Sequence, residues 1–343
     1  MPGKEYKDYR FAIFGRISYT DHFVKELNRL GFEKPVVIVS EDDEYQRDKN
    51  LLEKYNCFGG LEELSELGLC KLYKINNINT EEVLHLLNKK KCNIGISINC
   101  RSIINKSLID FFSGEILNIH SAHLPYERGA AGATWKILNN IDNVTSTLHY
   151  ITPAIDDGDI VLTKSINVDI SKSNPIDVIK KSNKVSELLI TDYLEKIVTS
   201  YTFKREVQDN SKGLYFPRLY TPVNAAIDWN WDGVYIERFI RAFGEPYEGA
   251  WSYCKDSKIS LIKCSLIFTK KDFHPYAYGR VVAVTDNEVK IIVKGGFLKI
   301  FEAEVGGNAI PIRNFFIEGD VFYNSLSDIK NSRTTRLKTS SMK

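Results

Sequence analysis

The hydrophobic positions of the first 120 residues follow two alternating periodicities. Short apolar runs at 10–15, 35–40 and 93–99 predict strands. The run at 93–99 is apolar at almost every position, as expected of a parallel strand buried on both faces. Between these runs, residues 20–32 and 79–91 place apolar side chains at helical spacing. The alternation predicts an α/β fold with a Rossmann-like, mostly parallel sheet flanked by helices.

The pattern changes in the second half of the chain. Apolar runs at 146–152 and 159–170 are separated by a turn rather than a helix, which predicts antiparallel edge strands. Residues 174–201 form one long amphipathic pattern, typical of a helix that covers a sheet face. Several short strand-like runs follow, and they predict a small antiparallel β-barrel, similar to an OB-fold.

These patterns divide the chain into four segments. We predict a Rossmann-like domain over residues 1–201 and an irregular, aromatic connector over residues 202–222. A barrel-like domain should follow over residues 223–325, and a flexible polar tail over residues 326–343.

Charge and hydropathy make some classes of protein less probable. The 343 residues carry 46 basic and 44 acidic side chains, a net charge of +2. Nucleic-acid-binding proteins more often show a clear basic surplus, so a nucleic-acid partner is not expected. No apolar run approaches the roughly 18 residues that span a bilayer, and the polar N-terminus lacks the apolar stretch of a signal peptide. We expect a cytoplasmic protein that does not associate with membranes.

The six cysteines are scattered along the chain. They form no CxxC pair and show no spacing typical of a metal site. We therefore expect reduced, mostly buried thiols and no metal cofactor.

Polar side chains follow the predicted strands at their carboxyl ends, where open α/β sheets bind ligands. Asn118 and His120 end the strand at 115–120, and their separation of two places both on one face. Asp156 lies in a loop between two later strands. An amide could stabilise an oxyanion, worth roughly 3 kcal/mol. An imidazole could move protons near neutral pH, and a carboxylate could orient that imidazole.

No enzyme nucleophile accompanies these groups. Ser121 should face away from His120, and the chain has no GxSxG motif. Direct attack by a substrate nucleophile is therefore favoured over a covalent enzyme intermediate. The pattern alone indicates acyl or group transfer, although an Asn-x-His pair at a strand end more often serves only loop hydrogen bonds. Two interpretations of His149 have equal weight: it is a partner of the site residues, or it is a buried residue of a strand.

Three longer segments resemble one family. LNIHSAHLPYERGAAGATWKILNN carries the Asn-x-His pair, STLHYITPAIDDGDIV carries an acidic residue, and AAIDWNWDGVYIERFIRAFGEPYEGAWSY opens the second domain. Together they resemble the formyltransferases that use N10-formyltetrahydrofolate. These include methionyl-tRNA formyltransferase, glycinamide ribonucleotide transformylase and the sugar-nucleotide N-formyltransferases. The resemblance covers nearly the whole chain.

The resemblance implies a role for each polar group. Asn118 would bind the formyl oxygen, His120 would handle the proton of the attacking amine, and Asp156 would fix His120. N10-formyltetrahydrofolate would be the co-substrate, with no metal. Its pteridine would bind near Cys100, Arg101, Ser102, Ile103 and Ile104, and near Ile155 and Asp157.

The connector indicates which kind of molecule accepts the formyl group. Tyr215, Phe216 and Arg218 resemble the Tyr-Phe-x-Arg connector of the sugar-nucleotide enzymes, notably the aminoarabinose formyltransferase domain. The tRNA enzymes usually carry a lysine-rich connector at this place. We therefore expect a nucleotide-linked amino-deoxysugar, with Arg128 and Arg218 as candidates for its phosphates.

The loop after the Asn-x-His pair departs from both subgroups. His123 and Gly129 of this loop are further candidates for acceptor contacts, because small residues let the backbone approach a ligand. Two alternatives stay open: a methionyl-tRNA formyltransferase, and a partner-dependent tailoring module or non-catalytic homologue. A homodimer through the C-terminal barrel is expected by analogy only.

Overall fold

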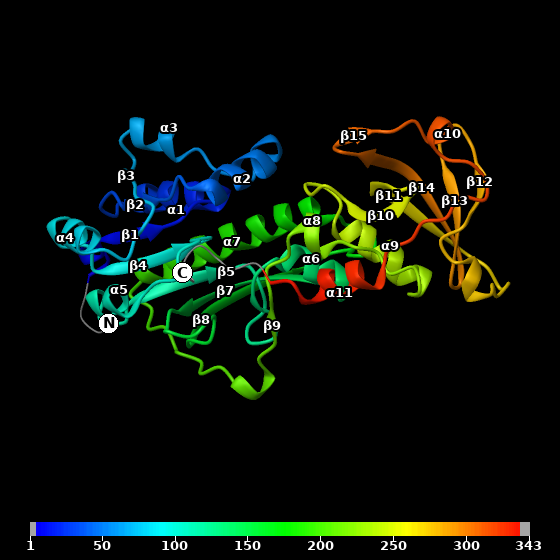
Figure 1. The fold of residues 1–343 in the computed structure, drawn as a ribbon. Coiled ribbons are helices and arrows are strands. Elements are labelled where there is room, and N and C mark those ends of the chain that lie inside the picture. The colour runs from blue at the N-terminus through cyan, green and yellow to red at the C-terminus, as the bar shows by residue number, and fades with distance from the viewer. Residues whose placement is uncertain (1–4, 337–343) are drawn as a thin grey trace.

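A seven-stranded sheet forms the centre of the N-terminal part in the computed structural model, which describes residues 5–336 (Figure 1). Its strands are β1 (Phe11–Phe14), β2 (Val36–Val39), β3 (Lys71–Lys74), β4 (Ile94–Ile98), β5 (Ile116–His120), β7 (Asn143–Tyr150) and β8 (Ile160–Asn167). Their order is β3-β2-β1-β4-β5-β7-β8. The first five strands in this order run parallel, whereas β7 and β8 are antiparallel. The mostly parallel sheet and its antiparallel edge are thus confirmed.

Helices cover both faces of this sheet (Figure 1). They are α1 (Ser18–Arg29), α2 (Asp43–Leu52), α3 (Leu61–Glu66), α4 (Glu81–Lys89), α5 (Lys106–Phe111), α6 (Gly132–Leu138) and α7 (Pro175–Val198). Along β1, Phe11 and Ile13 pack with α1 and α7, whereas Ala12 and Phe14 pack with α4 and α5. This alternation buries every position of β1, as the apolar run predicted. No helix within residues 5–336 is long and apolar enough to cross a bilayer.

Two helices occupy stretches for which the sequence predicted no helix. The first, α2, begins after Asp42, whose side chain accepts a hydrogen bond from the backbone N–H of Tyr45 at 3.0 Å. The second, α6, begins in the loop rich in glycine and alanine. Neither stretch has a long apolar period. The Asp42 cap supports α2, whereas α6 has no side-chain cap and is held by tertiary contacts such as the burial of Ile137.

The C-terminal part contains an antiparallel sheet of β10 (Ala250–Cys254), β11 (Ser257–Phe268), β12 (Val281–Val284), β13 (Val289–Val293), β14 (Gly296–Val305) and β15 (Asn308–Ala309). The order is β10-β11-β14-β13-β12, with β15 on β14. Residues 319–323 form backbone hydrogen bonds with β10 and with residues 279–281 at β12, the two edge strands of this sheet. Tyr323 and Tyr253 exchange two backbone hydrogen bonds of 2.9 Å, and the N–H of Phe322 donates to the carbonyl of Gly279 at 2.8 Å. These bonds draw the two edges together into the predicted barrel-like shape.

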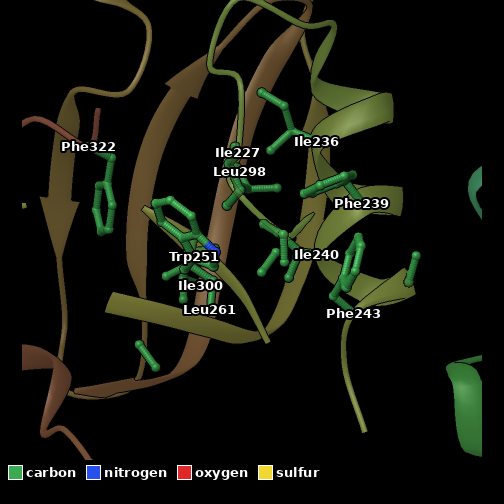
Figure 2. Close-up of a cluster of buried hydrophobic side chains, with 14 of the residues drawn as sticks. Ile227, Ile236, Phe239, Ile240, Phe243, Trp251, Leu261, Leu298, Ile300 and Phe322 are labelled. Atoms are coloured by element: carbon green, nitrogen blue, oxygen red, sulfur yellow. The ribbon is translucent and has the colours of Figure 1, made fainter. Parts of the chain in front are cut away.

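Four helices accompany this sheet: α8 (Thr221–Asn224), α9 (Gly233–Ala242), α10 (Ile312–Phe315) and α11 (Leu326–Thr334). Figure 2 shows Phe239 and Ile240 of α9 directed toward the sheet, where Leu298 lies. The same cluster continues through Ile137 of α6, so one hydrophobic core joins the two parts of the chain. Arg241 of α9 also donates to backbone carbonyls of the N-terminal part, at 2.7 and 2.8 Å.

The expectation of a flexible tail over residues 326–343 is wrong for its first half, which forms α11. A capping box at Ser325 starts this helix. Its Ser332 is buried, and the side chain of Asn224 donates to the Ser332 carbonyl at 2.8 Å. The cap and this contact stabilise a helix in a segment whose polar composition had suggested a flexible tail. Residues 337–343 lie outside the described part of the chain.

Short elements complete the described chain. The strands β6 (Arg128–Gly129) and β9 (Tyr215–Phe216) form a separate two-stranded sheet. The 3-10 helices are η1 (Tyr6–Asp8), η2 (Glu53–Tyr55), η3 (Asn210–Lys212) and η4 (Pro275–Ala277). The pair β6 and β9 joins the loop after β5 to the connector, and it therefore borders the site described next.

Candidate active site

A cavity of about 890 Å³ opens at the carboxyl ends of β4 and β5. Asn118 and His120 are the two half-buried positions of β5, and both line this cavity. Asp156, from the loop between β7 and β8, lines it as well. The structure thus brings the three predicted groups to one cavity, and strand alternation accounts for Asn118 and His120. Ser121, which we expected to face away, also lines the cavity, but its hydroxyl pairs with that of Tyr19 at 3.3 Å.

The carboxylate of Asp156 lies between two imidazoles. Its Oδ2 is 3.8 Å from Nε2 of His120, and its Oδ1 is 3.6 Å from Nε2 of His149. The N–H of Gly129 donates to Oδ2 at 2.9 Å. Asp156 has a φ of +52°, a left-handed conformation that aspartate tolerates better than most residues. The turn therefore points the carboxylate at β5 and fixes it there.

His149 is a site residue that sequence reasoning left undecided. In the antiparallel register of β5 and β7 it lies directly opposite Asn118. Its Nδ1 lies 2.9 Å from the carbonyl of Tyr150, which can only accept, so Nδ1 carries the proton. Its Nε2 then accepts from Nδ2 of Asn118 at 3.2 Å. Burial lowers the pKa of His149 to about 4, so the ring is neutral near pH 7 and orients the Asn118 amide.

His120 is held by a backbone group rather than by the carboxylate. Its Nε2 lies 2.8 Å from the carbonyl oxygen of Glu127. The 3.8 Å separation from Asp156 is longer than a hydrogen bond. Asp156 can therefore act on the His120 ring through its charge, while the carbonyl sets the orientation of the ring.

A buried ion pair adjoins this contact. Nζ of Lys136 lies 2.6 and 2.7 Å from the two carboxylate oxygens of Glu127. Lys136 is only 1% exposed. Sequence reasoning missed both residues, because nothing in a lysine of a short helix and a glutamate of a loop signals that they meet.

The connector reaches the site through β9. Arg128 pairs with Tyr215, and Gly129 pairs with Phe216, in parallel register. Gly129 has a φ of +101°, and a Cβ there would lie 2.2 Å from the Phe216 carbonyl oxygen. Only glycine fits at this position. Tyr215, Phe216 and Arg218 all line the cavity.

Two of the residues predicted to contact the acceptor make contacts within the protein. The guanidinium of Arg128 lines the cavity, yet it donates to the side chains of Gln208 at 2.8 Å and Asn210 at 2.6 Å. His123 is not among the residues that line the cavity. Its ring packs against Tyr126, with centroids 5.2 Å apart. These contacts tie both side chains to neighbouring loop residues.

The segments predicted to hold a pteridine also contribute to the cavity wall. Cys100, Arg101, Ser102, Ile103, Ile104 and Ile155 all line it, whereas Asp157 does not and accepts instead from the Thr152 hydroxyl. Ile103 and Ile155 remain 45% and 44% exposed, which is high for large apolar side chains. Burial raises the pKa of the Cys100 thiol to about 11, so this cysteine is a poor nucleophile. Within residues 5–336 no cluster of side chains could hold a metal ion.

Comparison with known families decides the class. A family model described as formyl transferase matches residues 9–190, and one described as formyl transferase, C-terminal domain, matches residues 220–318. The chain belongs to the formyl transferase family. This places the cavity and its polar groups within an enzyme of formyl transfer.

Curated relatives of this formyltransferase are distant. The chain is 27% identical over 242 residues to the bifunctional polymyxin resistance protein ArnA of Wigglesworthia glossinidia brevipalpis, covering 71% of the chain but only 36% of that protein. It is 24% identical over 259 residues to the methionyl-tRNA formyltransferase of Syntrophomonas wolfei, covering 76% of the chain and 81% of that protein.

Solved structures share the fold of this formyltransferase. One is WlaRD, described as a sugar 3N-formyl transferase in the presence of dTDP and 5-N-formyl-THF, with a TM-score of 0.62 and 22% identity over 87% of this chain and 98% of that one. Another is the N-formyltransferase of Helicobacter canadensis with folinic acid and dTDP-3-aminofucose, with a TM-score of 0.65 and 20% identity over 86% of this chain and 100% of that one.

Proposed function

We propose that this formyltransferase moves the formyl group of N10-formyltetrahydrofolate to the amine of a nucleotide-linked amino-deoxysugar. The observation that carries the proposal is the convergence of Asn118, His120 and Asp156 on a cavity bordered by the connector strand β9. The ligands named for the two similar structures, a formylated folate with dTDP or with dTDP-3-aminofucose, support it.

The reaction takes place at the formyl carbon. The amine nitrogen attacks this carbon, and the carbonyl oxygen becomes a negatively charged oxygen of a tetrahedral adduct. The bond from carbon to N10 then breaks. The amine loses one proton and N10 gains one, so the products are a formamide and tetrahydrofolate, without net release of a proton.

The polar groups suit these events. One N–H of the Asn118 amide is taken by His149, and the second is left for the adduct oxygen. Loss of one such donor costs about 10²–10³ in rate. His120 would accept the proton of the attacking amine. Asp156, at 3.8 Å, would stabilise the resulting imidazolium through its charge.

Different residues of the cavity wall suit the two substrates. The exposed apolar side chains of Ile103 and Ile155 would pack against the flat pteridine. Arg218 and Arg336 also line the cavity and would contact the phosphates of the sugar nucleotide. At about 890 Å³ the cavity is in the upper range of ligand sites, which are about 300–1,000 Å³. A cavity of this size suits the proposal that it takes the reacting ends of two substrates.

Methionyl-tRNA formyltransferase is the second candidate. The relative from Syntrophomonas wolfei bears that name, and the match covers most of both chains. The net charge of only +2 weighs against it, because binding a tRNA by its phosphates requires a basic surface.

A coupled assay tests both candidates. Release of tetrahydrofolate is measured with a panel of amino-sugar nucleotides and with methionyl-tRNA. We expect turnover with a sugar nucleotide and none with the tRNA, and His120→Ala should abolish turnover in a folded protein. Turnover with the tRNA alone would overturn the acceptor assignment. Full activity of His120→Ala would overturn the mechanism.

A further inference from the structure

A buried ion pair fixes the residue that binds His120. Lys136 is 1% exposed, and its Nζ contacts both carboxylate oxygens of Glu127 at 2.6 and 2.7 Å. Oε2 of Glu127 also accepts from the backbone N–H of His123 at 2.7 Å. An unpaired charge buried at such a place costs several kcal/mol. Each side chain therefore holds the other in place, and the Glu127 backbone is fixed between the end of β5 and α6.

The backbone carbonyl of Glu127 determines which nitrogen of His120 carries the proton. Nε2 lies 2.8 Å from this oxygen, and a carbonyl can only accept a hydrogen bond. Nε2 is therefore protonated, and in the neutral ring the lone pair resides on Nδ1. Asp156, at 3.8 Å from Nε2, is too distant to compete as a hydrogen-bond acceptor.

We propose that Glu127 and Lys136 are positioning residues that keep neutral His120 protonated at Nε2, so that Nδ1 accepts the proton of the acceptor amine. The proposal rests on the proposed function, in which His120 is that proton acceptor. The adduct nitrogen loses its proton to Nδ1, while Nε2 keeps its own proton and its bond to Glu127. The charged ring later returns one proton to N10, which restores the neutral tautomer.

A purely stabilising role makes a different prediction. Replacing both members of a buried ion pair with neutral or apolar residues of similar size is often neutral for stability. If the pair served stability alone, such a double variant would keep the wild-type tautomer and turnover. If the pair positions Glu127, the double variant folds but its loop moves, and the carbonyl no longer dictates the His120 tautomer.

The first experiment reads the tautomer in the wild-type protein. Histidine-selective ¹⁵N labelling and NMR at about pH 9, where histidines are ordinarily neutral, distinguish protonated from unprotonated ring nitrogens. His120→Gln assigns the signal. We expect His120 to be protonated at Nε2. Protonation at Nδ1 would overturn the proposal. This result does not depend on the activity of any variant or on the identity of the acceptor.

The second experiment compares two neutralised ion pairs. In Glu127→Gln/Lys136→Met we expect kcat to fall about tenfold or more, because a positioned general base is worth about 10²–10⁴-fold. The KM for the folate should change less than about twofold, and the His120 signal should become that of a tautomer mixture. The control is Glu288→Gln/Lys299→Met, which removes a half-buried pair with a 2.8 Å contact in the C-terminal sheet and should leave kcat unchanged.

The outcomes separate the two proposals. A folded Glu127→Gln/Lys136→Met protein with wild-type kcat and tautomer would refute the positioning role. If circular dichroism shows that this variant does not fold, Glu127→Gln alone is measured in the same way, and wild-type kcat and tautomer in that variant would refute the positioning role. If no acceptor supports turnover, the proposed function fails, but the tautomer of His120 is still measured.

Discussion

The buried histidine behind Asn118 should make the protein sensitive to mild acid. Burial lowers the pKa of His149 to about 4, so the folded protein holds this ring neutral until the pH is well below neutrality. The unfolded chain, in which a histidine titrates at about 6.5, takes up the proton earlier. Because the unfolded state binds more protons between these two values, stability falls as the pH falls through this window.

The size of the effect follows from the two pKa values. With about 6.5 unfolded and about 4 folded, proton linkage predicts a loss of about 2 kcal/mol on going from about pH 7.5 to about pH 5. Above about pH 7 the contribution is fully present, because both states are then neutral. His149→Gln removes this titration but keeps a side-chain carbonyl that can accept from Asn118.

Urea unfolding at the two pH values measures this loss. Other groups also titrate between them, so the informative quantity is the difference between wild type and His149→Gln. The wild type should lose about 2 kcal/mol more than the variant. His85→Gln, on the exposed side of α4, is the control and should follow the wild type. Equal losses in wild type and His149→Gln would show that His149 is not held neutral by burial.

Three further predictions concern other parts of the cavity. Gly129→Ala should lower the free energy of unfolding by about 2 kcal/mol or more and raise the KM for the acceptor, because its Cβ would meet the Phe216 carbonyl; urea unfolding and steady-state kinetics measure both. Arg336→Ala should raise the KM for the sugar nucleotide about tenfold without changing that for the folate, and equal changes in both would exclude a phosphate contact. With its pKa raised to about 11, the Cys100 thiol should react with iodoacetamide about 100-fold more slowly than a thiol of pKa 9.0, and fast labelling seen by mass spectrometry would contradict its burial.

The parts of the site that the sequence predicted are those that depend on local geometry. Asn118 and His120 share a face because side chains alternate along any strand, whatever surrounds it. The position of the cavity follows from the parallel sheet, whose strands end at one edge. The antiparallel pairing of β7 and β8 could also be predicted from the sequence, because a turn rather than a helix connects the two strands.

The parts that the sequence did not predict depend on pairings between distant segments. His149 meets Asn118 only because of the register of β5 and β7, and a shift of one residue would turn its ring to the other face. The pair of Glu127 and Lys136 depends on where α6 packs, and this helix has no long apolar period. Arg128, predicted as a phosphate ligand from its residue type, lines the cavity, and its hydrogen bonds to Gln208 and Asn210 could not be foreseen from the sequence.

The connector does more than border the proposed acceptor site, because it also holds the loop that carries Asp156. Nε2 of Gln208 donates to the carbonyls of Asp156 at 3.0 Å and Gly158 at 2.7 Å, while its Oε1 accepts from Arg128 at 2.8 Å. Gln208 thus bridges the loop that carries Asp156 and the strand β6 that pairs with β9. We expect a change in this bridge to move both Asp156 and the strand pair β6 and β9, which borders the proposed acceptor site. Substitutions at Gln208 should therefore alter kcat as well as the KM for the acceptor, whereas a residue that only touches the acceptor should alter KM alone.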